Sequence, residues 1–307
     1  MGLRCGIGLA GFPFEDAAGF WRWIELCERN DVDSFWQSDR LVSRDPQLES
    51  MSTMAALAGG TSRMKFGMNV TVVPFRDPLI LAKQCATIDF LSGGRLLPAF
   101  GVGPAVAPEW KAMGIPKEGR GARADEALRV MRRLWSEDSV SFEGEHYHYV
   151  DASISPRPVQ DPLPLWIGGS SEAAIRRTAE LGTGWVAGIQ TPVQVGPVVA
   201  QIQQRAREAG RPLDPEHFGA GVSFRFGSLD DPVVQKTIRG FQRFNPDLDP
   251  RSYFAAGGAD AVVERIEEYR RAGIFKFVLR PMATGADDTM EQTQRLLEEV
   301  LPRVHGG

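Results

Sequence analysis

A carboxylate and a guanidinium stand side by side at the end of one short apolar segment of this sequence. In DSFWQSDRL (33–41), Asp39 and Arg40 follow two aromatic residues that favour a strand. Charged groups of this kind can hydrogen-bond, polarise and anchor the polar groups of a ligand. Arg40 stays protonated at neutral pH and cannot relay a proton as an imidazole does. We therefore predict that Asp39 and Arg40 are catalytic residues that act by placing charge.

A second group of residues has the composition of an anion site. Gly168, Gly169, Ser170 and Ser171 come directly before a helix that we expect to begin near Glu172. Glycines let backbone N–H groups approach an anion at the positive end of a helix. The alternative is an ordinary turn from strand to helix that a serine caps. The residues alone leave both interpretations open.

The order of the secondary-structure elements indicates how these segments come together. A short apolar run followed by an amphipathic helix recurs along the chain. This alternation predicts an α/β fold with a parallel sheet and helices outside it, and eight strands close most economically into a (β/α)8 TIM barrel. The predicted strands cover residues 5–10, 33–36, 65–73, 95–103, 165–169, 184–188, 219–227 and 275–280.

Two segments interrupt the alternation. Residues 142–164 carry four prolines and predict a surface insertion after the fourth helix. Residues 228–254 predict a longer insertion after the seventh strand. Neither segment has enough apolar content for a core of its own, so we expect a single domain over residues 1–307.

A barrel would bring the residues that follow its strands to one face. Arg225 and Arg280 would join the charged pair there and could bind an anionic substrate or a phosphate. Arg280 is the stronger candidate, because the end of the eighth strand is a frequent anion site in barrels. The alternative for each arginine is a salt bridge with a neighbouring acid, which we favour for Arg44 beside Asp45.

Aromatic residues could wall an apolar pocket at the same face. Phe12 and Trp110 stand in loops that should overhang it, so we expect both to contact substrate. Trp36 and Phe14 fit the core better, because large aromatic side chains are buried more often than they touch ligands.

Composition excludes several other classes of protein. The net charge of −4 provides no basic surface for nucleic acid. The three cysteines and four histidines have neither metal-ligand spacing nor a place at the strand ends, so we predict no metal site and no disulfide. No apolar run approaches the roughly 18 residues of a membrane span, and no export signal is visible at the N-terminus. These features predict a cytoplasmic protein with a small-molecule substrate.

Several stretches, in their order along the chain, resemble the luciferase-like flavin and deazaflavin oxidoreductases. They are LSGGRLLPAFGVG (91–103), FEGEHYHY (142–149), PRPVQDPLPLWIGGSSEAA (156–174) with GTGW (182–185), and AAGGADAVVERIEEYRRAG (255–273). The resemblance implies a barrel, usually a homodimer, that binds either FMN or the deazaflavin coenzyme F420 at its C-terminal face.

Within this family, SDR (38–40) is similar to the F420 branch, where many members have aspartate followed by histidine. Asp39 is retained here, and Arg40 stands at the histidine position. Sugar-phosphate dehydrogenases of the branch have a glutamate directly after the glycines of the fourth strand, and Pro104 stands there instead. The resemblance thus implies an F420-dependent oxidoreductase that transfers a hydride to or from a small organic substrate other than a sugar.

The resemblance also implies which residues contact the cofactor. Asn69 and Val70 match a bond that is often a cis peptide behind the ring, although an ordinary buried strand is the alternative. Asp39 belongs to the hydrogen-bonding network of the ring or tail. The other implied cofactor residues are Val72, Gly101, Gly103, Gly168, Gly169, Ser170 and Ser171.

Two other functions stay open at this point. One is an FMN-dependent luciferase-like monooxygenase that uses reduced flavin and O2, and the other is a non-catalytic flavin-binding relative. Cofactor binding and turnover would separate the three.

Overall fold

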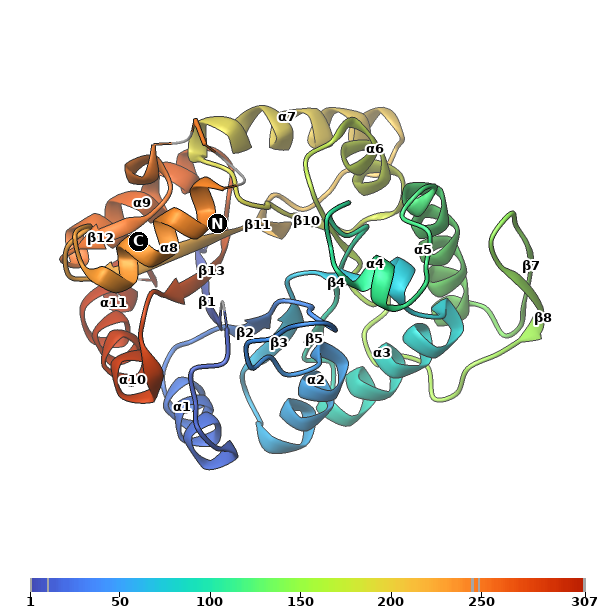
Figure 1. Ribbon diagram of the computed structural model, residues 1–307. Coiled ribbons are helices and arrows are strands. Elements are labelled where there is room, and N and C mark those ends of the chain that lie inside the picture. The colour runs from blue at the N-terminus through green and yellow to red at the C-terminus, as the bar shows by residue number, and fades with distance from the viewer. Residues whose placement is uncertain (1, 10, 244–245, 248, 306–307) are drawn as a thin grey trace.

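The computed structural model describes residues 2–9, 11–243, 246–247 and 249–305. Parallel strands curl into a TIM-barrel-like sheet, and the longer helices surround it (Figure 1). The strands of this sheet are β1 (Arg4–Leu9), β2 (Ser34–Gln37), β3 (Lys65–Met68), β4 (Thr71–Val72), β5 (Leu96–Leu97), β6 (Ala99–Gly101), β9 (Trp166–Gly168), β10 (Gly184–Val186), β11 (Phe218–Phe226), β12 (Ala255–Gly257) and β13 (Lys276–Pro281).

Pairing between the strands follows the order of the chain around the sheet. On one side β1 pairs with β2, β2 with β3, and β3 with β5. On the other side the order is β4, β6, β9, β10, β11, β13 and back to β1, and β12 pairs with β11. All these pairs are parallel, so the carboxyl ends of the strands lie at one end of the sheet. This is the α/β arrangement that the sequence predicted.

Two predicted strands are each broken in the middle. The stretch predicted at 65–73 divides into β3 and β4 at the cis peptide bond between Asn69 and Val70. The stretch predicted at 95–103 divides into β5 and β6 at Pro98, which has no N–H to give to a neighbouring strand.

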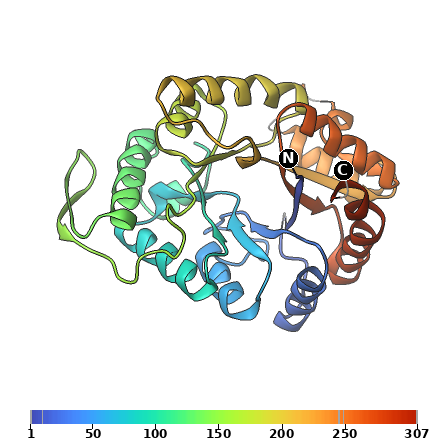
Figure 2. The same cartoon turned by 180° about the vertical axis from the view of Figure 1, so that it is seen from behind.

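The helices pack on the outer surface of the sheet (Figures 1 and 2). Asp16 caps α1 by accepting a hydrogen bond from Gly19 N at 2.7 Å, and Pro78 opens α3 as predicted. The helices are α1 (Ala17–Arg29), α2 (Ser50–Gly60), α3 (Pro78–Ser92), α4 (Glu109–Ala112), α5 (Arg120–Ser136), α6 (Glu172–Leu181), α7 (Pro192–Glu208), α8 (Pro232–Gln242), α9 (Ala259–Arg271), α10 (Gly285–Arg295) and α11 (Leu301–His305). Short 3₁₀ turns are η1 (Val73–Phe75), η2 (Pro215–His217) and η3 (Pro250–Ser252), and η4 (Leu296–Val300) is a π-helical turn.

The segments predicted as insertions have structure of their own. Between α5 and β9 lies an antiparallel hairpin of β7 (Val140–Glu143) and β8 (His148–Ala152), which projects from the side of the molecule in both views. The segment after β11 contains α8 and η3, and side chains of α8 form a small apolar cluster with Tyr253, Phe254 and Met282. Both segments therefore fold against the barrel-like body or extend from it.

The apolar core has an outer and an inner layer. The larger cluster fills the space between the sheet and the helices, and Phe14 belongs to it. A smaller cluster of Trp36, Trp166, Val278 and their neighbours fills the inside of the curled sheet. Trp36 and Phe14 are thus core residues, as expected. Within the described ranges, the structure contains no helix with the length and apolar character needed to cross a membrane.

Candidate functional site at the carboxyl ends of the strands

Asp39 lies at the centre of a hydrogen-bonding network directly after β2. Its side chain is 1% exposed. Arg76 donates to both carboxylate oxygens, at 2.6 and 2.9 Å. The backbone N–H of Val72 donates at 2.9 Å, and Ser50 Oγ donates at 3.1 Å. The carboxylate therefore ties the loop after β2 to β4, the segment after η1 and the start of α2.

Sequence reasoning did not identify Arg76. Besides Asp39, its guanidinium contacts Glu49 at 2.8 Å. Burial alone would lower the pKa of Arg76, but the hydrogen bonds and charges of Asp39 and Glu49 raise it above the ordinary value. Arg76 follows a 3₁₀ turn and not a strand, so a search restricted to strand ends passes over it. Its partner Asp39 was the available signal, because a buried carboxylate needs a cation.

Val70 lies between two glycines near this network. The structure has the cis peptide between Asn69 and Val70 that the family resemblance implied. A Cβ atom at Gly101 would lie 2.6 Å from Val70 Cγ2, and one at Gly168 would lie 2.8 Å from Val70 Cγ1. The strand neighbours of Val70 must therefore lack side chains for it to occupy this position.

Two further features lie in the segments next to Val70 and Gly101. Asn69 Nδ2 is buried and has no hydrogen-bond partner among the described residues. Gly103 has φ +72°, and a Cβ there would lie 2.8 Å from Val72 Cγ1. Next to the breaks in the third and fourth predicted strands, the surface thus contains glycines and an amide donor for which the described residues provide no acceptor.

The predicted Gly-Gly-Ser-Ser loop joins β9 to α6. Ser171 caps α6 by accepting a hydrogen bond from Ala174 N at 3.3 Å. For this residue, the ordinary turn with a serine cap is therefore the interpretation that the structure supports. Gly169 adopts φ +104°, which favours glycine. Gly168 lies against Val70, and Ser170 is exposed. The loop opens at the same end of the sheet as Asp39.

Arg40 and Arg44 extend from the loop after β2, and both are exposed. The predicted ion pair between Arg44 and Asp45 is wrong, since the two side chains do not come within 4 Å. Both residues are open to solvent, where such a contact gains little. Glu109, which is 3% exposed, holds this loop by accepting from Leu41 N and Val42 N, both at 3.2 Å.

Arg225 is paired with two acids. Its Nη1 lies 2.5 Å from Asp288 and its Nε 3.2 Å from Asp231, and Nη1 also donates to Met282 O. Arg225 therefore forms salt bridges, which was the alternative to anion binding, because carboxylates already bind its guanidinium.

Arg280 is in a different environment. No carboxylate of the described residues lies within 4 Å of it, although it is only partly exposed. Its guanidinium lies over Gly221, where a Cβ would be 2.6 Å from Nη2. Arg280 lines a cleft of about 510 Å³ together with Phe12, Ser223 and Lys236. Lys236 was not predicted, because it comes from the helix α8 and not from a strand end.

Of the two aromatic residues that we expected to contact substrate, Trp110 is buried and Phe12 lines the cleft. Trp110 is 5% exposed, packs on Phe75 and Val72, and donates its indole N–H to Pro104 O at 2.9 Å. It is a core residue of the loops, contrary to the open position that we expected. Phe12 is partly buried and lines the cleft beside Arg280.

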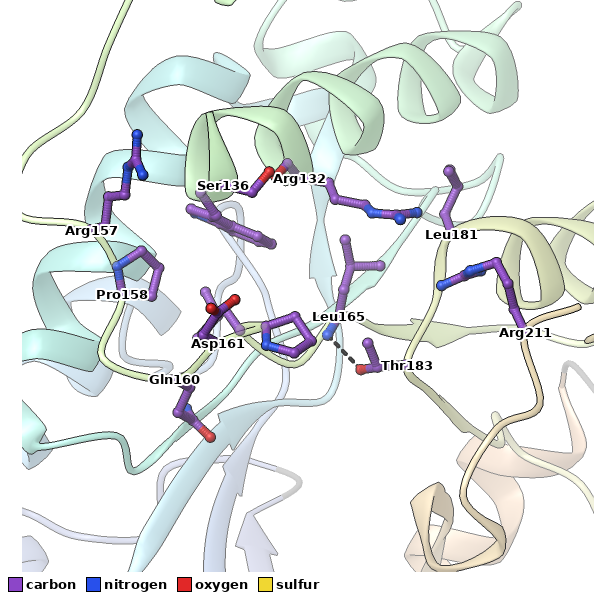
Figure 3. A pocket seen from close by; sticks show the side chains of 13 residues that line it. Arg132, Ser136, Arg157, Pro158, Gln160, Asp161, Leu165, Leu181, Thr183 and Arg211 are labelled. Atoms are coloured by element: carbon purple, nitrogen blue, oxygen red, sulfur yellow. Dashed lines mark hydrogen bonds between the residues drawn. The ribbon is translucent and has the colours of Figure 1, made fainter. Parts of the chain in front are cut away.

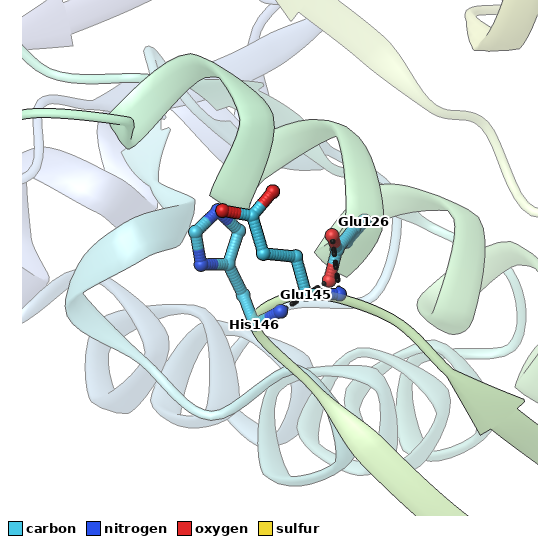
Figure 4. A group of neighbouring side chains, drawn as sticks. All are labelled: Glu126, Glu145 and His146. Atoms are coloured by element: carbon cyan, nitrogen blue, oxygen red, sulfur yellow. Dashed lines mark hydrogen bonds between the residues drawn. The ribbon is translucent and has the colours of Figure 1, made fainter.

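Glu126, Glu145 and His146 form a separate cluster at the turn of the β7–β8 hairpin (Figure 4). Their potential ligand atoms lie within 4.8 Å of one another. The Glu126 carboxylate accepts from the backbone N–H groups of Glu145, His146 and Tyr147, and these bonds lower its pKa against the effect of burial. The cluster anchors the hairpin turn to α5.

Comparison with known proteins agrees with the fold and the motifs. The family model described as luciferase-like monooxygenase matches residues 5–246. An uncharacterized protein of Mycobacterium tuberculosis is 33% identical over 213 residues, which cover 67% of this chain and 73% of that protein. The F420-dependent glucose-6-phosphate dehydrogenase of Amycolatopsis mediterranei is 27% identical over 314 residues, which cover 90% and 91%.

A solved structure of low sequence identity has the same fold. The oxygenating constituent of 3,6-diketocamphane monooxygenase from Pseudomonas putida, in complex with FMN, superposes with a TM-score of 0.80. It is 17% identical, and the match covers 99% of each chain. The family model, the curated relatives and the fold agree, and the chain belongs to the luciferase-like monooxygenase family.

Proposed function

We propose that this protein is an F420-dependent oxidoreductase that transfers a hydride between the deazaflavin and a small organic substrate. The surface around Val70 carries the proposal. Gly101 and Gly168 leave its flanks free of side chains, and the buried Asn69 Nδ2 has no hydrogen-bond partner in the described part of the chain. These features fit a flat ring that presents carbonyl oxygens. The relative described as an F420-dependent dehydrogenase supports the choice of cofactor.

The residues of this chain then divide into a cofactor side and a substrate side. When bound, the deazaflavin supplies the hydride chemistry. Asn69, Val70 and the backbone at Val72 hold the ring, and Asp39 fixes Val72 in place. The Gly168–Ser171 loop holds the phosphate with its backbone N–H groups and the exposed Ser170.

On the substrate side, we assign Arg40 to polarising the reacting group and Phe12 to the apolar wall. Arg280 anchors a negative charge of the substrate, because its own positive charge has no carboxylate partner within the described ranges. We also propose that residues 1–307 act as one domain and that two copies form a homodimer.

Titration with oxidised F420 and, separately, with FMN tests the choice of cofactor. We expect tighter binding of F420, and we expect Asp39→Ala to weaken that binding about tenfold, since Val72 N loses its acceptor. Ser50→Ala is the milder companion variant, because it removes one hydrogen bond and leaves the carboxylate paired with Arg76. Circular dichroism verifies that both variants are folded.

Each other outcome of this titration has a definite meaning. Unchanged F420 affinity in folded Asp39→Ala would remove the role of Asp39. Tight FMN binding with oxygen uptake would favour a monooxygenase that uses reduced flavin. Binding of either cofactor without turnover would identify a non-catalytic relative.

Arg280→Gln is expected to raise the KM of anionic substrates about tenfold, since a charge-assisted hydrogen bond is lost. Neutral substrates of the same shape should keep their KM. Steady-state kinetics on pairs of substrates that differ by one carboxylate measure this difference. Arg44→Gln, an exposed arginine of a neighbouring loop, is the matched control. An equal loss for charged and neutral substrates would contradict the assignment.

A further inference from the structure

A second cavity lies at the end of the sheet opposite the cofactor site. It has a volume of about 430 Å³ and is bordered by α5, the segment 157–165 and Arg211. Leu165 and Thr183 also line it, and they directly precede β9 and β10. The cavity therefore opens at the amino ends of the strands, where none of the residues assigned above lies.

Two arginines point into the same part of this cavity. Arg132 extends from α5 and Arg211 from the chain after α7, and Leu165 and Leu181 lie beside them (Figure 3). Arg211 is fixed in place, because it donates to Ala179 O at 2.9 Å and to Gly182 O at 3.3 Å. Two converging guanidinium groups present planar donor edges to the space between them.

These two positive charges are not neutralised by an ion pair in the part of the chain that the structure describes. Neither Arg132 nor Arg211 has a carboxylate within 4 Å, whereas the neighbouring Arg157 pairs with Asp138. Burial and, second, the nearby charge of Arg132 lower the pKa of Arg211. A bound anion would relieve this repulsion between like charges.

The rest of the lining limits what kind of anion fits. Trp135, Pro162 and Leu181 provide apolar surface for a ligand body. Asp161 also lines the cavity, so the lining carries one negative charge beside the two unpaired positive charges. A monoanion therefore matches the remaining charge better than a phosphate monoester, which carries nearly two negative charges at neutral pH.

We propose that this cavity is a second binding site, which takes a small organic monocarboxylate with an aromatic or alkyl body. Arg132 and Arg211 bind the carboxylate, and Trp135, Pro162 and Leu181 contact the apolar body. The site is separate from the cofactor site and does not depend on the choice between F420 and FMN.

Isothermal titration of the 307-residue chain with 1-naphthoate tests this site. We expect saturable binding, and we expect Arg132→Gln to weaken it about tenfold through loss of a charge-assisted contact. Arg132 is exposed and its side chain makes no hydrogen bond within the described ranges, so this variant should fold. The neutral 1-naphthalenemethanol should bind at least tenfold more weakly than the carboxylate.

Two arginine variants control for position. Arg129→Gln changes an exposed arginine of the same helix that does not line the cavity, and it should bind 1-naphthoate as the wild type does. Arg280→Gln changes the arginine of the other cleft, and the binding that Arg132→Gln weakens should persist in it. Absence of saturable binding, equal affinity in Arg132→Gln, equal affinity for the neutral compound, or loss of binding in Arg280→Gln would each overturn the proposal.

Discussion

Arg76→Met is expected to lower the free energy of unfolding by about 3 to 5 kcal/mol, the usual cost of leaving a buried charge without its partner. The Asp39 side chain is 1% exposed and takes two hydrogen bonds from Arg76. Methionine is long enough to fill much of the space but donates nothing. Urea denaturation monitored by circular dichroism measures the change.

A double variant separates the lost charge from the lost packing. Asp39→Asn with Arg76→Met removes both charges, so it should be less destabilised than Arg76→Met alone. Arg44→Met replaces an exposed arginine nearby and should change the free energy of unfolding by no more than about 0.5 kcal/mol. If Arg76→Met is as stable as Arg44→Met, the buried network does not have the role that we assign to it.

The same network explains why the site could be only partly predicted. Asp39 follows β2 and Arg280 lies near the end of β13, so the alternation of strands and helices located both at the carboxyl ends. Arg76, Glu109 and Lys236 come from turns and helices, and their roles depend on contacts with residues far away in the chain. Sequence periodicity contains no information about such contacts.

The sequence also did not reveal which arginines are paired with acids. Arg225 and Arg280 are equivalent by position, since both lie near the carboxyl ends of strands β11 and β13. Asp231 and Asp288 bind the first, and neither is its neighbour in sequence. Only the folded chain distinguishes an arginine that is satisfied from one that is available to a ligand.

The fold itself was easier to predict, apart from the breaks in two strands. The runs at 65–73 and 95–103 each read as one strand, but Pro98 and the Asn69–Val70 peptide interrupt them. Pro98 gave a visible warning, because proline removes a ladder donor. For Asn69–Val70, only the resemblance to a family indicated the break.

Gly101→Ala tests the surface that these breaks create. The new Cβ would lie 2.6 Å from Val70 Cγ2, so Val70 must move. Valine is branched at Cβ and has few rotamers to adopt, and overpacking of this kind costs about 1 to 3 kcal/mol. We expect a loss of that size in the free energy of unfolding. We also expect F420 to bind at least about tenfold more weakly, because Val70 would intrude into the ring site.

Val70→Ala should restore the space, because it removes Cγ2, the atom that the new methyl group would meet at 2.6 Å. The double variant Gly101→Ala with Val70→Ala should therefore be more stable than Gly101→Ala alone and should bind F420 more tightly. Gly188→Ala is the matched control, since a Cβ there has no heavy atom within 4 Å. Thermal unfolding and fluorescence titration measure the two effects separately. If the double variant loses as much as the sum of its single changes, contact between the new methyl group and Val70 is not the cause. If stability recovers and F420 affinity does not differ among the variants, the surface around Val70 does not hold the ring.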